Sequence, residues 1–329
     1  MSGRARSVRL EVPASSANLG AGFDTLALAL ELVDVFEVTE AAGVPPGSAA
    51  VTVRGEGEAE LPTDGSDRFS SAFLGAVQGA SRGWRVSMDN GIPLSRGLGS
   101  SAAATVAGLV AARELSDPGR RRDDTQLRND TQLRNDAQLR DDAQVLAEAS
   151  AIEGHPENAA ATLHGGFVVT TMSHGRPVFV RLDPPSSLRV CLFVPQRSLA
   201  TYEMRKVLPA TVDRADAVHN VGRAALAVGA FAEGRLDLLA AATEDRLHEP
   251  YRVAAYPELP TLLTAARRAG ALGACLSGAG STVLAFADSA ARCRTLADAF
   301  EAAAADLGLA GRSIVVSPRS AGIRWSRVR

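Results

Sequence analysis

The sequence predicts an α+β protein of two domains. Segments with strand-like and helix-like patterns mix along its 329 residues without the strict alternation of a βαβ repeat. This length exceeds that of one average domain. A turn-rich run, Asp183-Pro184-Pro185-Ser186-Ser187, interrupts the pattern near the middle. We therefore expect an N-terminal domain at 1–184 and a C-terminal domain at 185–329.

The elements of the N-terminal half follow from the spacing of apolar residues. Alternation predicts strands at 8–12, 51–54 and 84–88 and a strand pair at 26–38, with a turn-rich segment at 13–20. Helical spacing predicts a helix at 70–82, and a run of small apolar residues predicts another that ends near Leu115. A helix at 144–153 and strands at 167–172 and 178–182 complete this half.

The C-terminal half is predicted in the same way. It begins with a strand at 189–195, followed by helices at 215–232, 236–243 and 259–268. The uncharged run 269–287 contains many glycines, with serines and a threonine, so it predicts a glycine loop and not a membrane span. Within it, residues 272–287 are predicted to form two strands around that loop. An alanine-rich helix at 290–307 and a strand at 313–317 end the order.

A short repeat occupies residues 120–144. The hexapeptide Asp-Thr-Gln-Leu-Arg-Asn starts at Asp124 and at Asp130, and a near copy starts at Asp136. A period of six residues advances a helix by about 600°, so the leucines of successive copies would point in different directions. We expect a solvated insertion, disordered or loosely helical, with binding of a partner as the alternative.

Composition excludes several classes of protein. A net charge of −2, with 46% hydrophobic and 22% charged residues, is typical of a soluble globular protein and predicts no nucleic-acid or membrane surface. The only lysine, Lys206, follows no glycine loop, which excludes a P-loop nucleotidase and a protein kinase. The separated cysteines Cys191, Cys275 and Cys293 predict no disulfide or zinc site and fit a reducing cytoplasm. No apolar core follows the N-terminal arginines, so no signal peptide is expected.

The segment after Pro93 predicts a phosphate-binding loop. Gly97-Leu98-Gly99 allows close approach of the backbone to an anion, and Ser100 and Ser101 then open a helix of small residues. The amide groups and dipole at a helix N-terminus favour negative charge. The two serines supply hydroxyl groups for a phosphate or for Mg²⁺.

These residues belong to a set of motifs that resembles the GHMP kinases, which phosphorylate small molecules such as galactose, homoserine and mevalonate. The resemblance spans nearly the whole chain apart from the repeat. Its motifs are VPASSANLGAGFD (12–24), the loop at 93–103, and GACLSGAGST (273–282). The segments GHPEN (154–158) and EPYR (249–252) resemble the branch that acts on L-homoserine.

The resemblance implies a fold and a chemistry. The N-terminal domain would resemble part of ribosomal protein S5 and the C-terminal domain would be ferredoxin-like, with the site between them. The protein would use ATP and Mg²⁺ to phosphorylate the side-chain hydroxyl of L-homoserine, a step of threonine biosynthesis. Family members are often dimers, so a homodimer is possible on this basis.

The resemblance also implies a role for each matching residue. Asp24 would hold the substrate's ammonium group, and Arg205 and Arg252 its carboxylate. The residues near the reacting hydroxyl would be Asn18, His155 and Asn158, and Thr201 would be a further substrate contact. The nucleotide would contact Pro93, Arg96, Gly97, Leu98, Gly99, Ser100, Ser101, Ala102, Ser277, Gly278 and Gly280. The metal would contact Ser100, Ser101 and Glu153.

No lysine is available as a catalytic base, so we expect transfer by positioning and charge stabilisation, with ATP accepting the proton. His164, His174, His219 and His248 fit no metal-binding spacing and are expected to be structural or surface residues. One alternative is a GHMP kinase for another small alcohol, L-threonine or an isoprenoid precursor. Another is a catalytically silent relative that senses a ligand.

Overall fold

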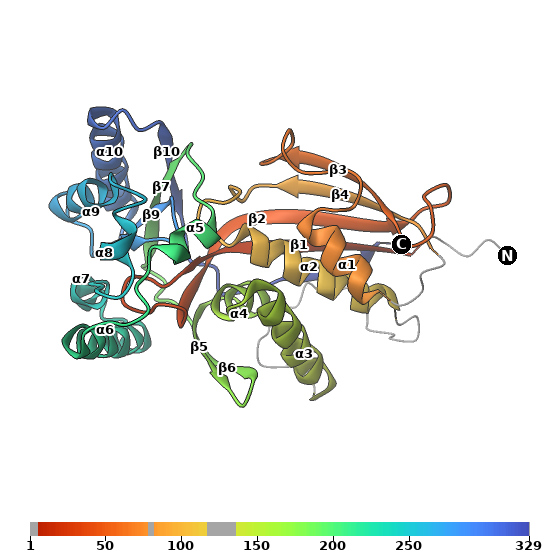
Figure 1. Cartoon of the computed structure of the whole chain (residues 1–329), viewed down its shortest axis with the longest axis horizontal. Coiled ribbons are helices and arrows are strands. Elements are labelled where there is room, and N and C mark those ends of the chain that lie inside the picture. Colours follow the sequence, from red (N-terminus) through yellow and green to blue (C-terminus); the bar gives the residue numbers. More distant parts are fainter. Residues whose placement is uncertain (1–5, 78–81, 117–135, 329) are drawn as a thin grey trace.

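The chain consists of two β-sheets, each covered by helices (Figure 1), which confirms the α+β class. The structure is a computed structural model, and it describes residues 6–77, 82–116 and 136–328. Among the helices of these ranges, none combines the length and the apolar character that a membrane-spanning segment needs.

The first sheet has seven strands in the order β11-β1-β2-β4-β3, and β5 pairs with β2 while β6 pairs with β5. Among the described strands of this sheet, β3 and β4 alone run parallel, and the other pairs are antiparallel. The strands are β1 (Ser7–Ala17), β2 (Leu26–Glu40), β3 (Ala49–Gly55), β4 (Trp84–Asn90), β5 (Phe167–Ser173), β6 (Arg176–Leu182) and β11 (Arg324–Val328).

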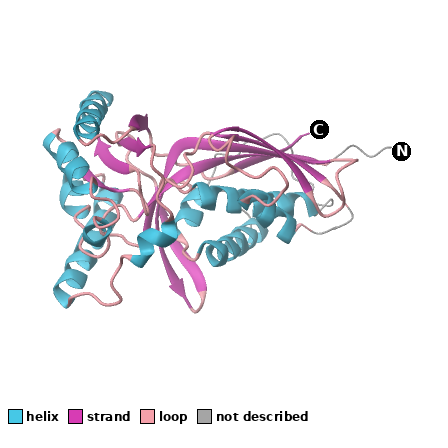
Figure 2. Ribbon diagram, turned by 45° about the horizontal axis from the view of Figure 1, so that its top comes forward, coloured by secondary structure: helices cyan, strands magenta, loops and turns pink. Residues whose placement is uncertain are grey.

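Helices cover one face of this sheet (Figure 2). They are α1 (Arg68–Ala76), α2 (Ser100–Ser116), α3 (Asp136–Glu153) and α4 (Glu157–His164). The small residues of α2 let it pack closely on β1, α1, α3 and α4. Aromatic side chains join α1 to the sheet, because Phe69 stacks on Phe36 with 4.5 Å between ring centroids and Phe73 meets Trp84 edge-on at 5.1 Å.

The second sheet is antiparallel and has four strands, in the order β10-β7-β9-β8. They are β10 (Gly311–Val316), β7 (Arg189–Pro195), β9 (Val283–Ala287) and β8 (Gly273–Leu276). Helices α9 (Leu259–Arg268) and α10 (Ala290–Asp306) pack on it. The other helices of this half are α5 (Thr201–Lys206), α6 (Arg214–Glu233), the 3₁₀ turn η1 (Leu236–Leu238), α7 (Leu239–Ala242) and α8 (Glu249–Arg252).

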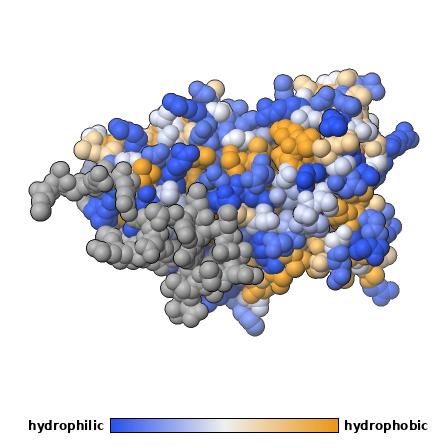
Figure 3. Space-filling view, turned by 180° about the vertical axis from the view of Figure 1, so that it is seen from behind, coloured by the Kyte–Doolittle hydropathy of each residue, from blue (hydrophilic) through white to orange (hydrophobic). Residues whose placement is uncertain are grey.

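Segment 183–188 joins β6 of the first sheet to β7 of the second, whereas the C-terminal strand β11 returns to pair with β1. The boundary between 184 and 185 stays a prediction. On the face seen in Figure 3, hydrophilic side chains separate the apolar patches.

Two strand predictions were wrong in extent. Residues 13–17 form a strand and not a turn, because Pro13 lies beside a register shift in the β1–β2 ladder and the strand continues to Ala17. Residues 26–38 form the single strand β2 and not a pair. Asp34 lies buried within this strand, where its carboxylate accepts a hydrogen bond from the Ile92 amide at 2.9 Å.

Two helix predictions also differ from the structure. The helix predicted at 70–82 ends at Ala76, where Val77 becomes extended, and residues 78–81 lie outside the described ranges. The helix predicted at 144–153 begins earlier, at Asp136, because Arg113 of α2 donates to the Asp141 carbonyl and pairs with Glu148. Of the insertion predicted at 120–144, residues 120–135 lie outside the described ranges.

Candidate active site

The predicted phosphate loop leads directly into the N-terminus of α2. Its backbone is left-handed at Ser95, Gly97 and Gly99, with φ of 54°, 75° and 72°. A side chain at Gly97 would overlap the carbonyl oxygen of Ser277, and one at Gly99 would overlap the hydroxyl of Ser15. Glycine is therefore required by backbone conformation and by close packing, and the loop presents the first amides of α2.

Other residues predicted to contact the nucleotide lie within the protein. Pro93 is buried, and Leu98 and Ala102 are each 1% exposed, so these three can offer backbone groups alone. Arg96 does not present a free guanidinium, because its Nε, Nη1 and Nη2 donate to the carbonyls of Pro195, Leu94 and Gln196. It anchors the loop to the end of β7.

The glycine loop between β8 and β9 packs against the phosphate loop. Ser277 donates its hydroxyl hydrogen to the Gly97 carbonyl at 2.6 Å, and its oxygen lies 2.8 Å from the Ser16 hydroxyl. The Gly278 carbonyl accepts from Asn18 Nδ2 at 2.9 Å and from Arg252 Nη1 at 2.8 Å. Gly280, with φ of 89°, closes the turn. Motifs from both halves of the chain therefore meet at one place.

The predicted metal ligands come together between α2 and the end of α3. The Glu153 carboxylate accepts hydrogen bonds from Ser101 Oγ at 3.0 Å and from Thr105 Oγ1 at 2.7 Å. Ser100 precedes them at the first position of α2. The described residues hold no cluster of three or more His, Cys, Asp or Glu side chains. One carboxylate with hydroxyl groups nonetheless fits Mg²⁺, which is often held by one or two carboxylates and substrate phosphates.

Thr105 and Arg68 were not among the predicted site residues. The Glu153 side chain is nearly buried, and Arg68 places a positive charge beside it, with Nε 4.0 Å from Glu153 Oε1. Thr105 lies one helical turn after Ser101, and this i, i+4 spacing is the signal that could have identified it.

The first motif and α5 form a charged pair. Asp24 and Arg205 share two hydrogen bonds, of 2.7 and 2.9 Å. Asn18 shapes the turn that carries Asp24, because its Oδ1 accepts from the Asp24 amide at 3.0 Å. The predicted ammonium-binding residue and one predicted carboxylate-binding residue are thus paired with each other. Thr201 is exposed, one turn before Arg205.

Arg252 has a different environment. It is 1% exposed, and none of the described carboxylates lies within 4 Å of its guanidinium. Burial, with the nearby charge of Arg205, lowers the pKa of Arg252 to about 10. The Phe23 ring, which was not predicted, lies 5.6 Å from the Arg205 guanidinium carbon and 5.7 Å from that of Arg252. A buried arginine without an acidic partner is a candidate anion site.

Near the phosphate loop, His155 and Asn158 flank the buried Glu157. His155 Nδ1 lies 2.8 Å from Glu157 Oε1 in an ion-pair contact. Burial lowers the pKa of His155, but Glu157 more than offsets this effect and leaves that pKa above its usual value. Asn158 Oδ1 accepts from Ser15 Oγ at 2.9 Å, beside Gly99. Sequence reasoning missed Glu157, although it lies between two predicted site residues.

Comparisons with known proteins identify the family of the chain. Residues 68–166 match the model of the GHMP kinases N terminal domain, and residues 227–306 match GHMP kinases C terminal. A homoserine kinase from Deinococcus radiodurans is 42% identical over 95% of this chain and 94% of its own length. One from Streptomyces avermitilis is 41% identical over 97% and 98%. The crystal structure of homoserine kinase from Cytophaga hutchinsonii superposes with a TM-score of 0.81 at 24% identity, covering 99% of both chains.

Proposed function

Since the chain belongs to the homoserine kinases, a branch of the GHMP kinase family, we propose that it transfers the γ-phosphate of ATP to the side-chain hydroxyl of L-homoserine. The product is O-phospho-L-homoserine, and the reaction belongs to threonine biosynthesis. The observation that supports the amino-acid substrate best is the buried, carboxylate-free Arg252 beside the Asp24–Arg205 pair.

The nucleotide phosphates bind at the N-terminus of α2, against the backbone of the phosphate loop and the glycine loop. The first amides of the helix and its dipole stabilise their negative charge. Glu153, with Ser100 and Ser101, would hold Mg²⁺, which would supply positive charge to the phosphate oxygens.

Homoserine binds as a zwitterion. Its ammonium group contacts Asp24, and its carboxylate lies between the guanidinium groups of Arg205 and Arg252. This exchange is balanced in charge, because Arg205 gives up part of its contact with Asp24 and gains a substrate carboxylate. A substrate without an ammonium group, such as mevalonate, would leave Asp24 without this partner.

The reacting hydroxyl lies near His155 and Asn158, which orient it toward the γ-phosphorus. A bond forms between the hydroxyl oxygen and phosphorus while the bond to the ADP oxygen breaks, and the hydroxyl proton passes to the transferred phosphate. Asn18 has one amide hydrogen and one lone pair beyond its bonds to Gly278 and Asp24, so it can also contact the hydroxyl.

ADP release with homoserine, threonine, serine and mevalonate as acceptors tests the proposal. We expect the highest kcat/KM with homoserine. A preference for another acceptor would assign a different small alcohol, and nucleotide binding without ADP release from any acceptor would indicate a sensor. Either result contradicts the proposed function.

Variants at Asp24 and in α5 test the substrate contacts. Asp24→Asn removes the charge that meets the ammonium group, so we expect KM for homoserine to rise by about tenfold to 100-fold with KM for ATP unchanged. Glu203→Gln is the matched control, because among the described residues Glu203 pairs only with the exposed Lys206, at 2.8 Å. Equal KM values for the two variants would remove Asp24 from the site.

A further inference from the structure

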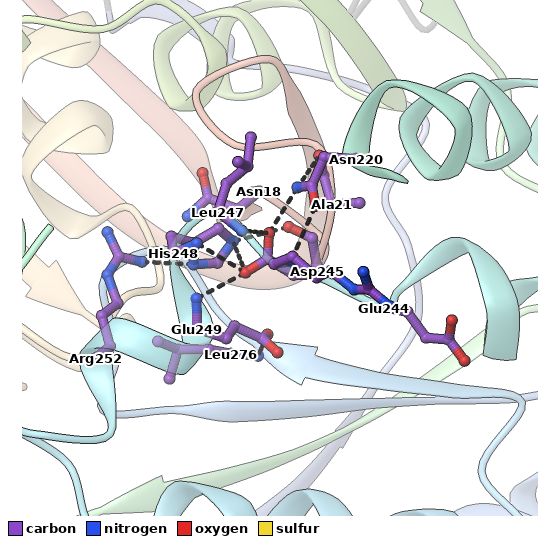
Figure 4. Close-up of polar contacts among 12 residues, drawn as sticks. Asn18, Ala21, Asn220, Glu244, Asp245, Leu247, His248, Glu249, Arg252 and Leu276 are labelled. Carbon is purple, nitrogen blue, oxygen red and sulfur yellow. Dashed lines mark hydrogen bonds and ion pairs between the residues drawn. The ribbon is translucent and has the colours of Figure 1, made fainter. Parts of the chain in front are cut away.

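A buried polar cluster includes Arg252 of the candidate active site (Figure 4). Its members are Asn220 of α6, Asp245 and His248 before α8, and Arg252 in α8. The His248 side chain is completely buried. The proposed function uses Arg252 but gives no role to His248, so the cluster raises the question of what this histidine does.

Asp245 fixes the start of α8. Its carboxylate accepts hydrogen bonds from the amides of Leu247, His248 and Glu249, at 2.7 to 3.0 Å, and from Asn220 Nδ2 at 2.7 Å. Four donors therefore satisfy a buried carboxylate, as a helix cap does. The backbone that carries His248 is held in one position relative to α6.

The hydrogen bonds of His248 assign its tautomer. Nε2 lies 2.8 Å from the Gly20 carbonyl oxygen, which can only accept, so Nε2 carries the hydrogen. Nδ1 then has a lone pair, and it lies 3.1 Å from Nη1 of Arg252, which can only donate. Complete burial lowers the pKa of His248 to about 4, and the Arg252 charge acts in the same direction against the nearby Asp245. The imidazole is therefore neutral near pH 7.

This tautomer fixes the plane of the Arg252 guanidinium. Nη1 is shared between His248 Nδ1 and the Gly278 carbonyl, while Nε lies 3.4 Å from the Met204 carbonyl. Among the described residues none hydrogen-bonds Nη2, which leaves that nitrogen for an anion. Through Gly20, the same histidine contacts the turn that carries Asp24.

We propose that His248 is a positioning residue, which orients the Arg252 guanidinium toward the homoserine carboxylate and joins that arginine to the turn bearing Asp24. This inference rests on the proposed function, since it assumes that Arg252 receives the carboxylate. His248 itself contacts neither substrate.

Two substitutions separate the two hydrogen bonds of the ring. His248→Asn retains an acceptor near the position of Nδ1, so it can still orient Arg252, but it loses the bond to Gly20. His248→Gln can reach the Gly20 carbonyl from the position of Nε2 but loses the acceptor for Arg252. Each variant loses one buried hydrogen bond, so we expect the two variants to be destabilised to a similar extent. Their thermal unfolding temperatures check this expectation.

The experiment compares kcat/KM for two acceptors, homoserine and 3-amino-1-propanol (below, aminopropanol), which is homoserine without its carboxylate. For His248→Gln we expect kcat/KM to fall by roughly tenfold to 100-fold with homoserine and less than threefold with aminopropanol. For His248→Asn we expect the ratio of the two kcat/KM values to stay within about threefold of wild type. The proposal would be overturned if kcat/KM in His248→Gln fell equally with both acceptors or did not fall with homoserine. It would also be overturned if His248→Asn lowered the ratio of kcat/KM for homoserine to kcat/KM for aminopropanol by more than about threefold.

Arg252→Met separates this proposal from the proposed function. If Arg252 binds the carboxylate, this variant lowers kcat/KM for homoserine far more than for aminopropanol. Equal effects on both acceptors would refute the carboxylate assignment itself. A selective effect in Arg252→Met together with no selective effect in His248→Gln would refute the positioning role alone.

Discussion

Gly97→Ala would disturb the contact between the phosphate loop and the glycine loop. Gly97 has a φ of 75°, and a Cβ added there would overlap the Ser277 carbonyl oxygen. The substitution therefore combines left-handed backbone strain with a forced displacement of backbone against backbone. Ser277 also donates its hydroxyl to the Gly97 carbonyl, so both loops would move.

Gly175→Ala isolates the first of these two costs. Gly175 has the same φ of 75° but no atom within 4 Å of an added Cβ. We expect this control to lose about 1–2 kcal/mol of unfolding free energy, the usual cost of a left-handed non-glycine residue, with unchanged kinetics. Gly97→Ala should lose more than the control. A displacement of about 1 Å at the phosphates costs roughly 100-fold in rate, so we expect a fall of that order in kcat/KM for ATP.

Urea unfolding gives the stabilities, and ADP release at varied ATP gives the kinetics. If Gly97→Ala and Gly175→Ala lost the same stability and kept the same ATP kinetics, the packing of Gly97 on Ser277 would not order the phosphate site. The reasoning from loop geometry to nucleotide binding would then be refuted.

Three further predictions concern the metal, the hydroxyl and a buried carboxyl. Glu153→Gln should raise the Mg²⁺ concentration for half-maximal activity by about tenfold to 100-fold, and Thr105→Val by less; an unchanged Mg²⁺ titration would remove Glu153 from the metal site. Asn158→Ala and His155→Ala should each lower kcat by at least about tenfold with KM for ATP unchanged, and turnover equal to wild type in both would exclude their orienting role. Burial raises the pKa of Glu249 from 4.5 to about 8, so the folded state binds its proton more tightly and this contribution to stability is lost as pH rises from 4.5 to 8. Relative to Glu249→Gln, wild type should lose up to about 1.4 kcal/mol of unfolding free energy per pH unit in this window, and a pH-independent difference would contradict the shift.

The main parts of the site were predictable because each is encoded locally. Glycines at 97 and 99 before a helix of small residues predict an anion-binding turn. In the structure both glycines are left-handed, and the turn packs against the glycine loop through the Ser277 hydroxyl. Residues whose roles depend on distant neighbours were not predictable from spacing. Phe23 lies near two arginines that follow it by about 180 and 230 positions, and nothing near Phe23 in the sequence indicates them.

His248 shows the same limit. In the sequence it matches no metal-binding pattern, and it was expected to be a structural or surface residue. Its partners come from α8 and from the turn at Gly20, so its tautomer is fixed only once these segments are folded together. The extent of β1 was missed for a related reason, because the ladder with β2 determines where the strand ends.

The position of the transferred phosphate tests the central claim most directly. After reaction with ATP and homoserine, proton–phosphorus correlation spectroscopy identifies the atoms next to the new phosphate. We predict coupling to the methylene protons beside the side-chain oxygen, as expected when Asp24 and Arg252 hold the zwitterion and direct its hydroxyl toward the loop at Gly97. Free phosphate alone, or a phosphate on the carboxylate, would contradict this arrangement.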